Sequence, residues 1–346
     1  MNKTVSNFII AIIAAFMLFA SSLAMAQTEI SMSTVYMNTH PTVVNAWEPW
    51  FKEVAGKTDG KLKLTYFNPN TLASLGDTFD ATVSGMIGLG GMDHARNPGK
   101  FPIFTVMELP GVARSAESGS MVVWELFNKH PEFQKELKDI KPLWVWVSAP
   151  FQLHTTKKQV KTLADLKGMQ IIAWNKTSVN ILKALGANAI MMPPTDSYLA
   201  LERGMADGIL CPLAPVISFK ISEAVRYTTV SDIFVTPFWA GFGYPVWNSL
   251  PKNYQAVLQE TTGEGMARMS GKTLDAGDIN DSARLKANGH TFYVLPKEER
   301  DRWFTATSSL RENWVKEMES LGLKNARRIM EDAFNLGTKY TATASR

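Results

Sequence analysis

The stretch LADLKGMQIIAWNKTSVNILKALGANAIMMPPTDSYLALERGMADGILCP, residues 163–212, decides the fold of this chain. Its segments MQIIAW (169–174), AIMMPP (189–194) and GILCP (208–212) have the length and apolar content of buried strands. Between these strands lie two segments with apolar residues at helical spacing, and each ends at a glycine, Gly186 or Gly204. The alternation of strands and helices predicts a parallel sheet, and such sheets bind ligands at the carboxyl ends of their strands.

The predicted carboxyl ends carry no charged side chain. The residues there are Ile172, Trp174, Met192 and Cys211. A ligand bound at this edge of the sheet would therefore meet an apolar surface.

The first 26 residues have the features of a secretory signal peptide. Lys3 supplies a positive charge, Phe8 to Phe19 form an almost unbroken apolar run, and Ala24-Met25-Ala26 offers small residues for cleavage. We expect export and a mature chain that begins near Gln27; a retained N-terminal membrane anchor is the alternative.

The mature chain, about 320 residues long, suits two domains or lobes better than one core. The net charge of the whole sequence is small, +4, and argues against nucleic-acid binding. Cys211 is the single cysteine, so no intramolecular disulfide is possible, and we expect a small buried side chain there.

Motifs of catalysis are missing from the sequence. There is no G-x-S-x-G, H-E-x-x-H, Cys-x-x-Cys or complete phosphate loop, and the five histidines are widely spaced. We expect no metal site and no cofactor. An exported enzyme that uses Asp93 and His94 as acid and base is the alternative to a binding protein.

Several short motifs occur in a characteristic order along the mature chain. They are GKLKL (60–64) with Leu75-Gly76, GKFPIFTVMELP (99–110), TLADLKG (162–168), YLALERGMADG (198–208) and WNSLP (247–251). In this order and spacing, the chain resembles the DctP-type solute receptors of tripartite ATP-independent periplasmic (TRAP) transporters over nearly its whole mature length.

The resemblance implies an α/β fold of two lobes, each a mixed, mostly parallel sheet flanked by helices, with a long helix spanning both. Residues 27–149 and about 237–278 would form lobe I, and residues 150–236 and about 279–330 lobe II. Residues 331–346 would form a C-terminal helix or tail. The implied protein is a periplasmic receptor, a monomer or weak dimer, that closes on a small organic solute and delivers it to the transporter's membrane subunits. A sensor that docks on a signalling protein is a further alternative.

The chain departs from the family where most members hold a ligand carboxylate. The usual arginine after D-L-K-G falls on Ile172, a second arginine of some relatives on Gln152, and a frequent asparagine on Cys211. Because an unpaired carboxylate in a closed cleft costs several kcal/mol, we expect a ligand that is aromatic, uncharged or a monoacid.

The candidate ligand-binding residues combine aromatic and apolar surface with a few polar groups. Tyr36, Trp174 and Trp239 could stack on the ligand, with Trp146 as a further aromatic candidate, and Asp93 and Gln152 could orient it. Arg96 or His154 could replace the missing arginine. The full set is Tyr36, Asp93, Arg96, Gln152, His154, Ile172, Trp174, Met192, Cys211 and Trp239.

Overall fold

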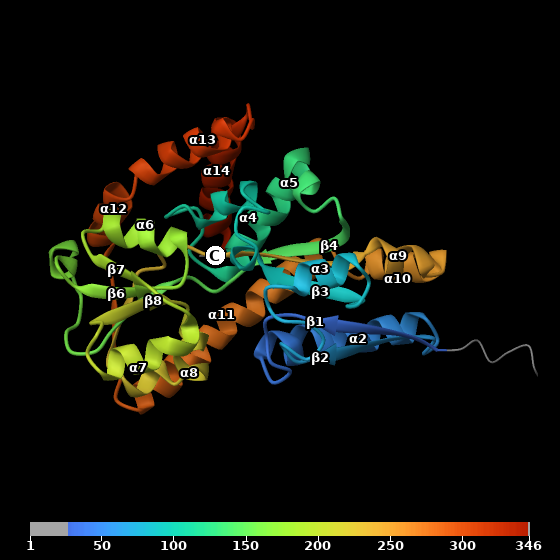
Figure 1. The fold of residues 1–346 in the computed structure, drawn as a ribbon, viewed down its shortest axis with the longest axis horizontal. Coiled ribbons are helices and arrows are strands. Elements are labelled where there is room, and N and C mark those ends of the chain that lie inside the picture. Colours follow the sequence, from blue (N-terminus) through green and yellow to red (C-terminus); the bar gives the residue numbers. More distant parts are fainter. Residues whose placement is uncertain (1–26, 345–346) are drawn as a thin grey trace, which may run out of the picture.

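The computed structural model describes residues 27–344, which form two lobes, each built on its own sheet (Figure 1). The predicted signal peptide lies outside the described residues. No described helix is long and apolar enough to cross a membrane.

The sheet of the first lobe has the strand order β2-β1-β3-β10-β4. Strand β1 pairs in parallel with β2 and β3, whereas β10 runs antiparallel between β3 and β4. The late strand β10 therefore completes a sheet made by the first part of the chain. The bounds are β1 Thr28–Ser33, β2 Leu62–Phe67, β3 Leu89–Asp93, β4 Ile140–Val147 and β10 Pro237–Gly243.

The sheet of the second lobe has the order β11-β9-β5-β8-β6-β7. The stretch that opened the sequence analysis supplies β8, β6 and β7, which pair in parallel as predicted. Strand β5 runs antiparallel to β8 and β9, so the sheet is mixed. The bounds are β5 Gln152–Thr155, β6 Gln170–Ala173, β7 Asn188–Met191, β8 Gly208–Cys211, β9 Tyr227–Val230 and β11 Thr291–Val294.

Helices cover both sheets. Those of the first lobe are η1 Val43–Trp47, α2 Glu48–Lys57, α3 Thr78–Val83, η2 His94–Arg96, η3 Ile103–Glu108, α4 Ala116–Lys129, α5 Pro131–Glu136, α9 Tyr244–Ser249 and α10 Lys252–Glu260. Those of the second lobe are η4 Leu163–Leu166, α6 Lys176–Ala184, η5 Pro194–Asp196, α7 Ser197–Glu202, α8 Leu213–Ser218, η6 Ile221–Glu223 and α12 Lys297–Ala306.

The helix α11, Glu264–Ala287, crosses from the first lobe to the second (Figure 1). It packs against α4 in the first lobe and α8 in the second. Gly271 allows the close approach to α4, because a Cβ there would lie 2.6 Å from the carbonyl oxygen of Ala116. The expected two-lobed α/β fold with a spanning helix is confirmed.

Two linkers also join the lobes, and they run side by side. Residues 148–151 connect β4 to β5, and residues 231–236 connect β9 to β10. The Ser148 amide donates to the Thr236 carbonyl at 2.8 Å and the Phe151 amide to the Phe234 carbonyl at 2.9 Å. The rings of Phe151 and Phe234 stack with centroids 4.1 Å apart. The paired linkers form a hinge stiffened by these contacts.

The C-terminal helices α13, Ser309–Ser320, and α14, Ala326–Ala344, return to the first lobe. Their buried residues, including Trp314, Met318 and Ile329, share one core cluster with Phe104 and Val147 of that lobe. The expected second lobe included about residues 279–330. This range is too long, because α13 and the start of α14 lie within it but pack on the first lobe. The apolar side chains of α13 and α14 find their partners on η3 and α4 instead.

The glycine run at residues 88–91 serves packing in strand β3. A Cβ on Gly90 would lie 1.9 Å from the hydroxyl oxygen of Thr82 on α3. The run thus lets α3 lie directly on the strand that ends at Asp93.

Candidate functional site

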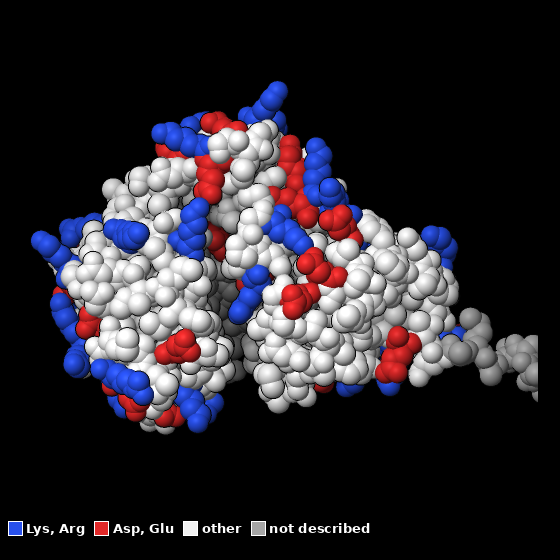
Figure 2. Space-filling model, in the orientation of Figure 1, with Lys and Arg blue, Asp and Glu red and all other residues white. Residues whose placement is uncertain are grey.

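The surface of the molecule is hollowed between the two lobes (Figure 2). The lobes meet there through a hydrogen bond from the Thr177 hydroxyl, in the first turn of α6, to the Glu108 carboxylate at the end of η3. Helix α6 follows β6 directly, so the carboxyl end of that strand points toward the first lobe. This is the edge at which the sequence predicted ligand binding.

Tyr36 anchors an aromatic cluster on the first-lobe side. Its ring stacks on His40 with centroids 4.1 Å apart and on Phe238 with centroids 5.9 Å apart. Phe238 in turn stacks on Trp146 at 5.0 Å. Burial raises the pKa of Tyr36, and the negative charge of Asp93 adds to the rise, so the phenol lies near that carboxylate.

Asp93 ends β3 and forms an ion pair with Arg96. The Nε atom of Arg96 donates to Oδ2 of Asp93 at 3.1 Å. Burial raises the pKa of Asp93 and the Arg96 guanidinium opposes the rise. The Arg96 side chain is 35% exposed, and this bond occupies its Nε atom, so its terminal nitrogens can still donate to a further acceptor.

Glu108 is buried beside this ion pair. Its exposed fraction is 5%, and burial raises its pKa to about 7, with Asp93 adding to the rise and Thr177 opposing it. Asp93 thus influences both Tyr36 and Glu108, which places the three side chains in one neighbourhood.

The second-lobe side presents half-buried apolar surface after β6. The Nε1 atom of Trp174 donates to the Ser197 hydroxyl at 3.0 Å, and its ring lies 6.1 Å from that of Phe219. Met192 is also partly buried against the same core cluster. These two predicted residues keep some exposed surface near the carboxyl end of the sheet.

Four of the predicted residues are fully buried. Ile172, His154, Cys211 and Trp239 are each 0% exposed. Ile172 and Cys211 lie in the second-lobe core, and Trp239 in the first-lobe core edge-on to Phe79 at 5.1 Å. The expectation that they contact a ligand is revised, because they offer it no surface. Trp146 is buried in the same way.

His154 and His94 are held inside the protein by hydrogen bonds. His154 bonds the Thr228 hydroxyl at 3.0 Å and the Cys211 carbonyl at 3.1 Å, and burial lowers its pKa to about 4. The Nδ1 atom of His94 bonds the Pro237 carbonyl at 2.7 Å, and burial lowers its pKa to about 3. Both rings are neutral near pH 7, so His154 cannot replace the missing arginine as a cation.

Gln152 acts in the hinge. Its Oε1 atom accepts from the backbone amides of Ser231 and Asp232 at 2.8 and 3.0 Å, and its Nε2 atom donates to the Asp232 carboxylate at 2.8 Å. Asp232 has a φ of 46°, a left-handed conformation that this clamp supports. The expected role of Gln152 in orienting the ligand is replaced by one in fixing the linker.

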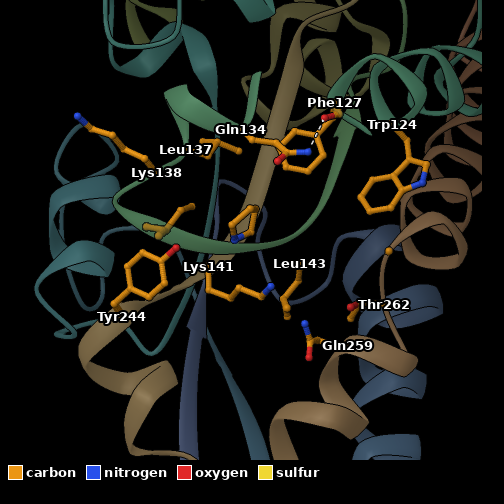
Figure 3. A pocket seen from close by; sticks show the side chains of 13 residues that line it. Trp124, Phe127, Gln134, Leu137, Lys138, Lys141, Leu143, Tyr244, Gln259 and Thr262 are labelled. Atoms are coloured by element: carbon orange, nitrogen blue, oxygen red, sulfur yellow. Dashed lines mark hydrogen bonds between the residues drawn. The ribbon is translucent and has the colours of Figure 1, made fainter. Parts of the chain in front are cut away.

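A second concavity is lined by first-lobe residues alone (Figure 3). It has a volume of about 580 Å³ and contains none of the predicted residues. It is lined by residues of α4, α5, β4, α9 and α10 and their connections: Trp124, Phe127, Gln134, Lys138, Lys141 and Tyr244 among them. Since no second-lobe residue lines it, lobe closure would not enclose a ligand there.

Among residues 27–344, no group of three or more histidine, cysteine or carboxylate side chains is arranged to hold a metal ion. The candidate site is an aromatic and apolar cleft that also contains the Asp93–Arg96 ion pair and the buried carboxyl group of Glu108.

Sequence reasoning missed Glu108 and its partner Thr177. Glu108 is the one charged residue in FPIFTVMELP, residues 101–110. A lone carboxylate in an apolar run is costly unless it has a partner or is neutral, and that signal could have identified it.

Comparisons with known proteins agree with this architecture. The family model for DctP, described as bacterial extracellular solute-binding protein, family 7, matches residues 32–317. A TRAP solute-binding protein from Rhodoferax ferrireducens, solved with copurified benzoate, has 23% identity and a TM-score of 0.83 over 92% of this chain and 100% of its own. A marine metagenome TRAP protein specific for aromatic acids, solved with 3-hydroxybenzoate, has 24% identity and a TM-score of 0.83 over 91% and 99%. A periplasmic TRAP protein from Desulfovibrio salexigens, in an open complex, has 28% identity and a TM-score of 0.81 over 91% and 97%.

Proposed function

This chain belongs to the DctP family of bacterial extracellular solute-binding proteins, and from that premise we propose that its solute is an aromatic monocarboxylate. The match of the family model to residues 32–317 confirms the resemblance seen in the sequence motifs. The chain is a TRAP-type receptor for a small organic solute, bound in the cleft between the lobes.

The observation that carries the proposal is the pairing of aromatic surface with the partly exposed guanidinium of Arg96. Tyr36 stacks between His40 and Phe238, and its pKa responds to Asp93, the ion-pair partner of Arg96. An aromatic ring can pack against the part of Tyr36 that these neighbours leave exposed, while its carboxylate accepts from the terminal nitrogens of Arg96. Trp174 and Met192 would cover the ring from the second lobe.

The same residues disfavour a dicarboxylate. A second carboxylate would approach Asp93 and Glu108, and the apolar Ile172 gives it no charged partner. An uncompensated charge in such a cleft costs several kcal/mol. The benzoate and 3-hydroxybenzoate found in two proteins of similar fold are chemically consistent with this preference.

The wider role follows from the family. We propose that the receptor acts in the periplasm, releases its solute unchanged, and delivers it to the membrane subunits of a TRAP transporter. Recovery of a chemically altered solute would instead support the alternative of an exported enzyme.

Calorimetric titration of the purified mature protein tests the proposed solute class. We expect benzoate, 3-hydroxybenzoate or mandelate to bind, and succinate and glucuronate to bind at least 100-fold more weakly, on the order of 3 kcal/mol. Arg96→Gln should weaken binding of the aromatic acid by roughly 10- to 100-fold, since a charged hydrogen bond contributes about 1.5–3 kcal/mol. Arg327→Gln, which breaks an exposed ion pair with Glu312, is the matched control. Tight binding of succinate or glucuronate alone would refute the proposal.

A further inference from the structure

Glu108 and Thr177 make a direct side-chain contact between the lobes at the start of α6. Glu108 ends η3 of the first lobe, and Thr177 lies in the first turn of α6 of the second. The Thr177 hydroxyl donates to Oε2 of Glu108. The Glu108 side chain is nearly fully buried. Loss of the hydrogen bond would therefore cost free energy, because a buried carboxyl group would be left without a partner.

The carboxyl group also faces the hinge. Thr236, the last residue of the second linker, lies close enough for its hydroxyl to affect the pKa of Glu108, although that hydroxyl makes no hydrogen bond of good geometry. Glu108 therefore lies where the first lobe, the second lobe and the linker 231–236 come together. Bending of this linker would separate the lobes.

We propose that Glu108 and Thr177 form an interlobe latch that holds the receptor in its closed form over the solute. The latch rests on the proposed function for the identity of the solute, but its geometry does not depend on which solute binds. Opening of the hinge would break the hydrogen bond and expose the carboxyl group to water.

The charged groups around Glu108 determine how the latch responds to pH. Asp93 on β3 faces it, and Arg96 on η2 neutralises much of the charge of Asp93. On α6, Lys176 is turned toward Glu317 of α13 at 3.2 Å. On α5, Glu136 accepts from the Ile103 and Phe104 amides at the opposite end of η3. On α14, Asp332 is paired with Lys129 and His130, and β10 brings no titratable side chain.

Burial raises the pKa of Glu108 to about 7 where it contacts Thr177, from the ordinary value of 4.5 that it would regain in water. Between these two values the closed form holds a proton that the open form has released. Closure is therefore fully favoured below about pH 4.5 and weakens as the pH rises toward 7, with no further change above it.

Two substitutions separate the hydrogen bond from the titration. Glu108→Gln keeps an oxygen that can accept from Thr177 but cannot ionise, so solute affinity should lose its pH dependence between pH 5 and 7. Thr177→Val removes the hydroxyl at nearly equal volume, and should weaken solute binding about tenfold at pH 5, the effect of a hydrogen bond to a buried carboxyl group. Thr305→Val, at an exposed position of helix α12, is the matched control.

Small-angle X-ray scattering of the solute-free protein tests the latch independently of the solute. We expect a larger radius of gyration for Thr177→Val than for the native chain at pH 5, and a native chain that expands between pH 5 and 7.5 while Glu108→Gln does not. Unchanged scattering of Thr177→Val, or a native pH response in Glu108→Gln, would overturn the latch. Failure of every aromatic acid to bind, with these scattering changes intact, would overturn the proposed solute and leave the latch standing.

Discussion

Ile172 lies on β6, and its side chain belongs to the second-lobe core. By resemblance, its position after D-L-K-G is that of the family's usual arginine, and the substitution favours the prediction of a ligand other than a dicarboxylate. The structure, however, buries Ile172 completely between β6 and the helices α7 and α8. The sequence pattern could not reveal this, since a strand period of two leaves open which face of the sheet borders the cleft.

The burial of Ile172 leads to a prediction for Ile172→Arg. The core cluster around it consists of apolar side chains such as Leu201, Ile209 and Leu213, and it offers no carboxylate partner. Arginine cannot escape its charge by losing a proton, so the variant should lose several kcal/mol of unfolding free energy and gain no dicarboxylate affinity. Urea unfolding followed by circular dichroism measures this.

Ile172→Val is the control for volume, with an expected loss of about 0.5–1.5 kcal/mol. A stable Ile172→Arg variant that binds succinate would show that this side chain can reach the cleft after all.

At the scale of single elements, periodicity predicted the strands and helices of residues 163–212, but it could not predict which elements pack together elsewhere. Pro49 lies in the first turn of α2, directly after η1, because proline fits the first turn of a helix better than its interior. The packing of α13 and α14 on the first lobe was missed, since an amphipathic pattern states that a helix buries a face but not against which element.

The spanning helix α11 provides a prediction with an internal control. Alanine at Gly271 would bring its Cβ within 2.6 Å of the α4 backbone, whereas alanine at Gly277 would meet its nearest atom, on Pro41, at 3.9 Å. Gly271→Ala should destabilise the protein by about 1–3 kcal/mol through overpacking. Gly277→Ala should stabilise it by about 0.5–1 kcal/mol, because helical glycine carries an entropic cost.

Thermal unfolding of the two variants measures the difference. Equal melting temperatures would mean that α4 and α11 can move apart freely. Their close approach would then not determine how the two lobes are held together.

At the scale of the whole molecule, the site could be predicted only in part from the sequence. Tyr36, Asp93 and Arg96 could be proposed as ligand contacts because they surround the end of a strand or follow it in a polar loop, and they stay predictions. Glu108 and Thr177, which lie 69 residues apart in the chain, were not, because only the meeting of the lobes brings them together. Short-range patterns carry no information about such contacts between distant segments.

The way the chain shares its elements between the lobes leads to a prediction for the whole molecule. Helix α11 packs on both lobes, the paired linkers are hydrogen-bonded, and α12 lies in the second-lobe core while α13 and α14 lie in that of the first. Unfolding of one lobe would therefore strip packed surface from the other. We expect differential scanning calorimetry to show one unfolding transition, which moves as a whole when an aromatic acid is added. At 100 times its dissociation constant the acid should add about 2.7 kcal/mol of stability. Two transitions, of which only one responds to the acid, would show instead that the lobes fold independently and that the solute is held by a single lobe.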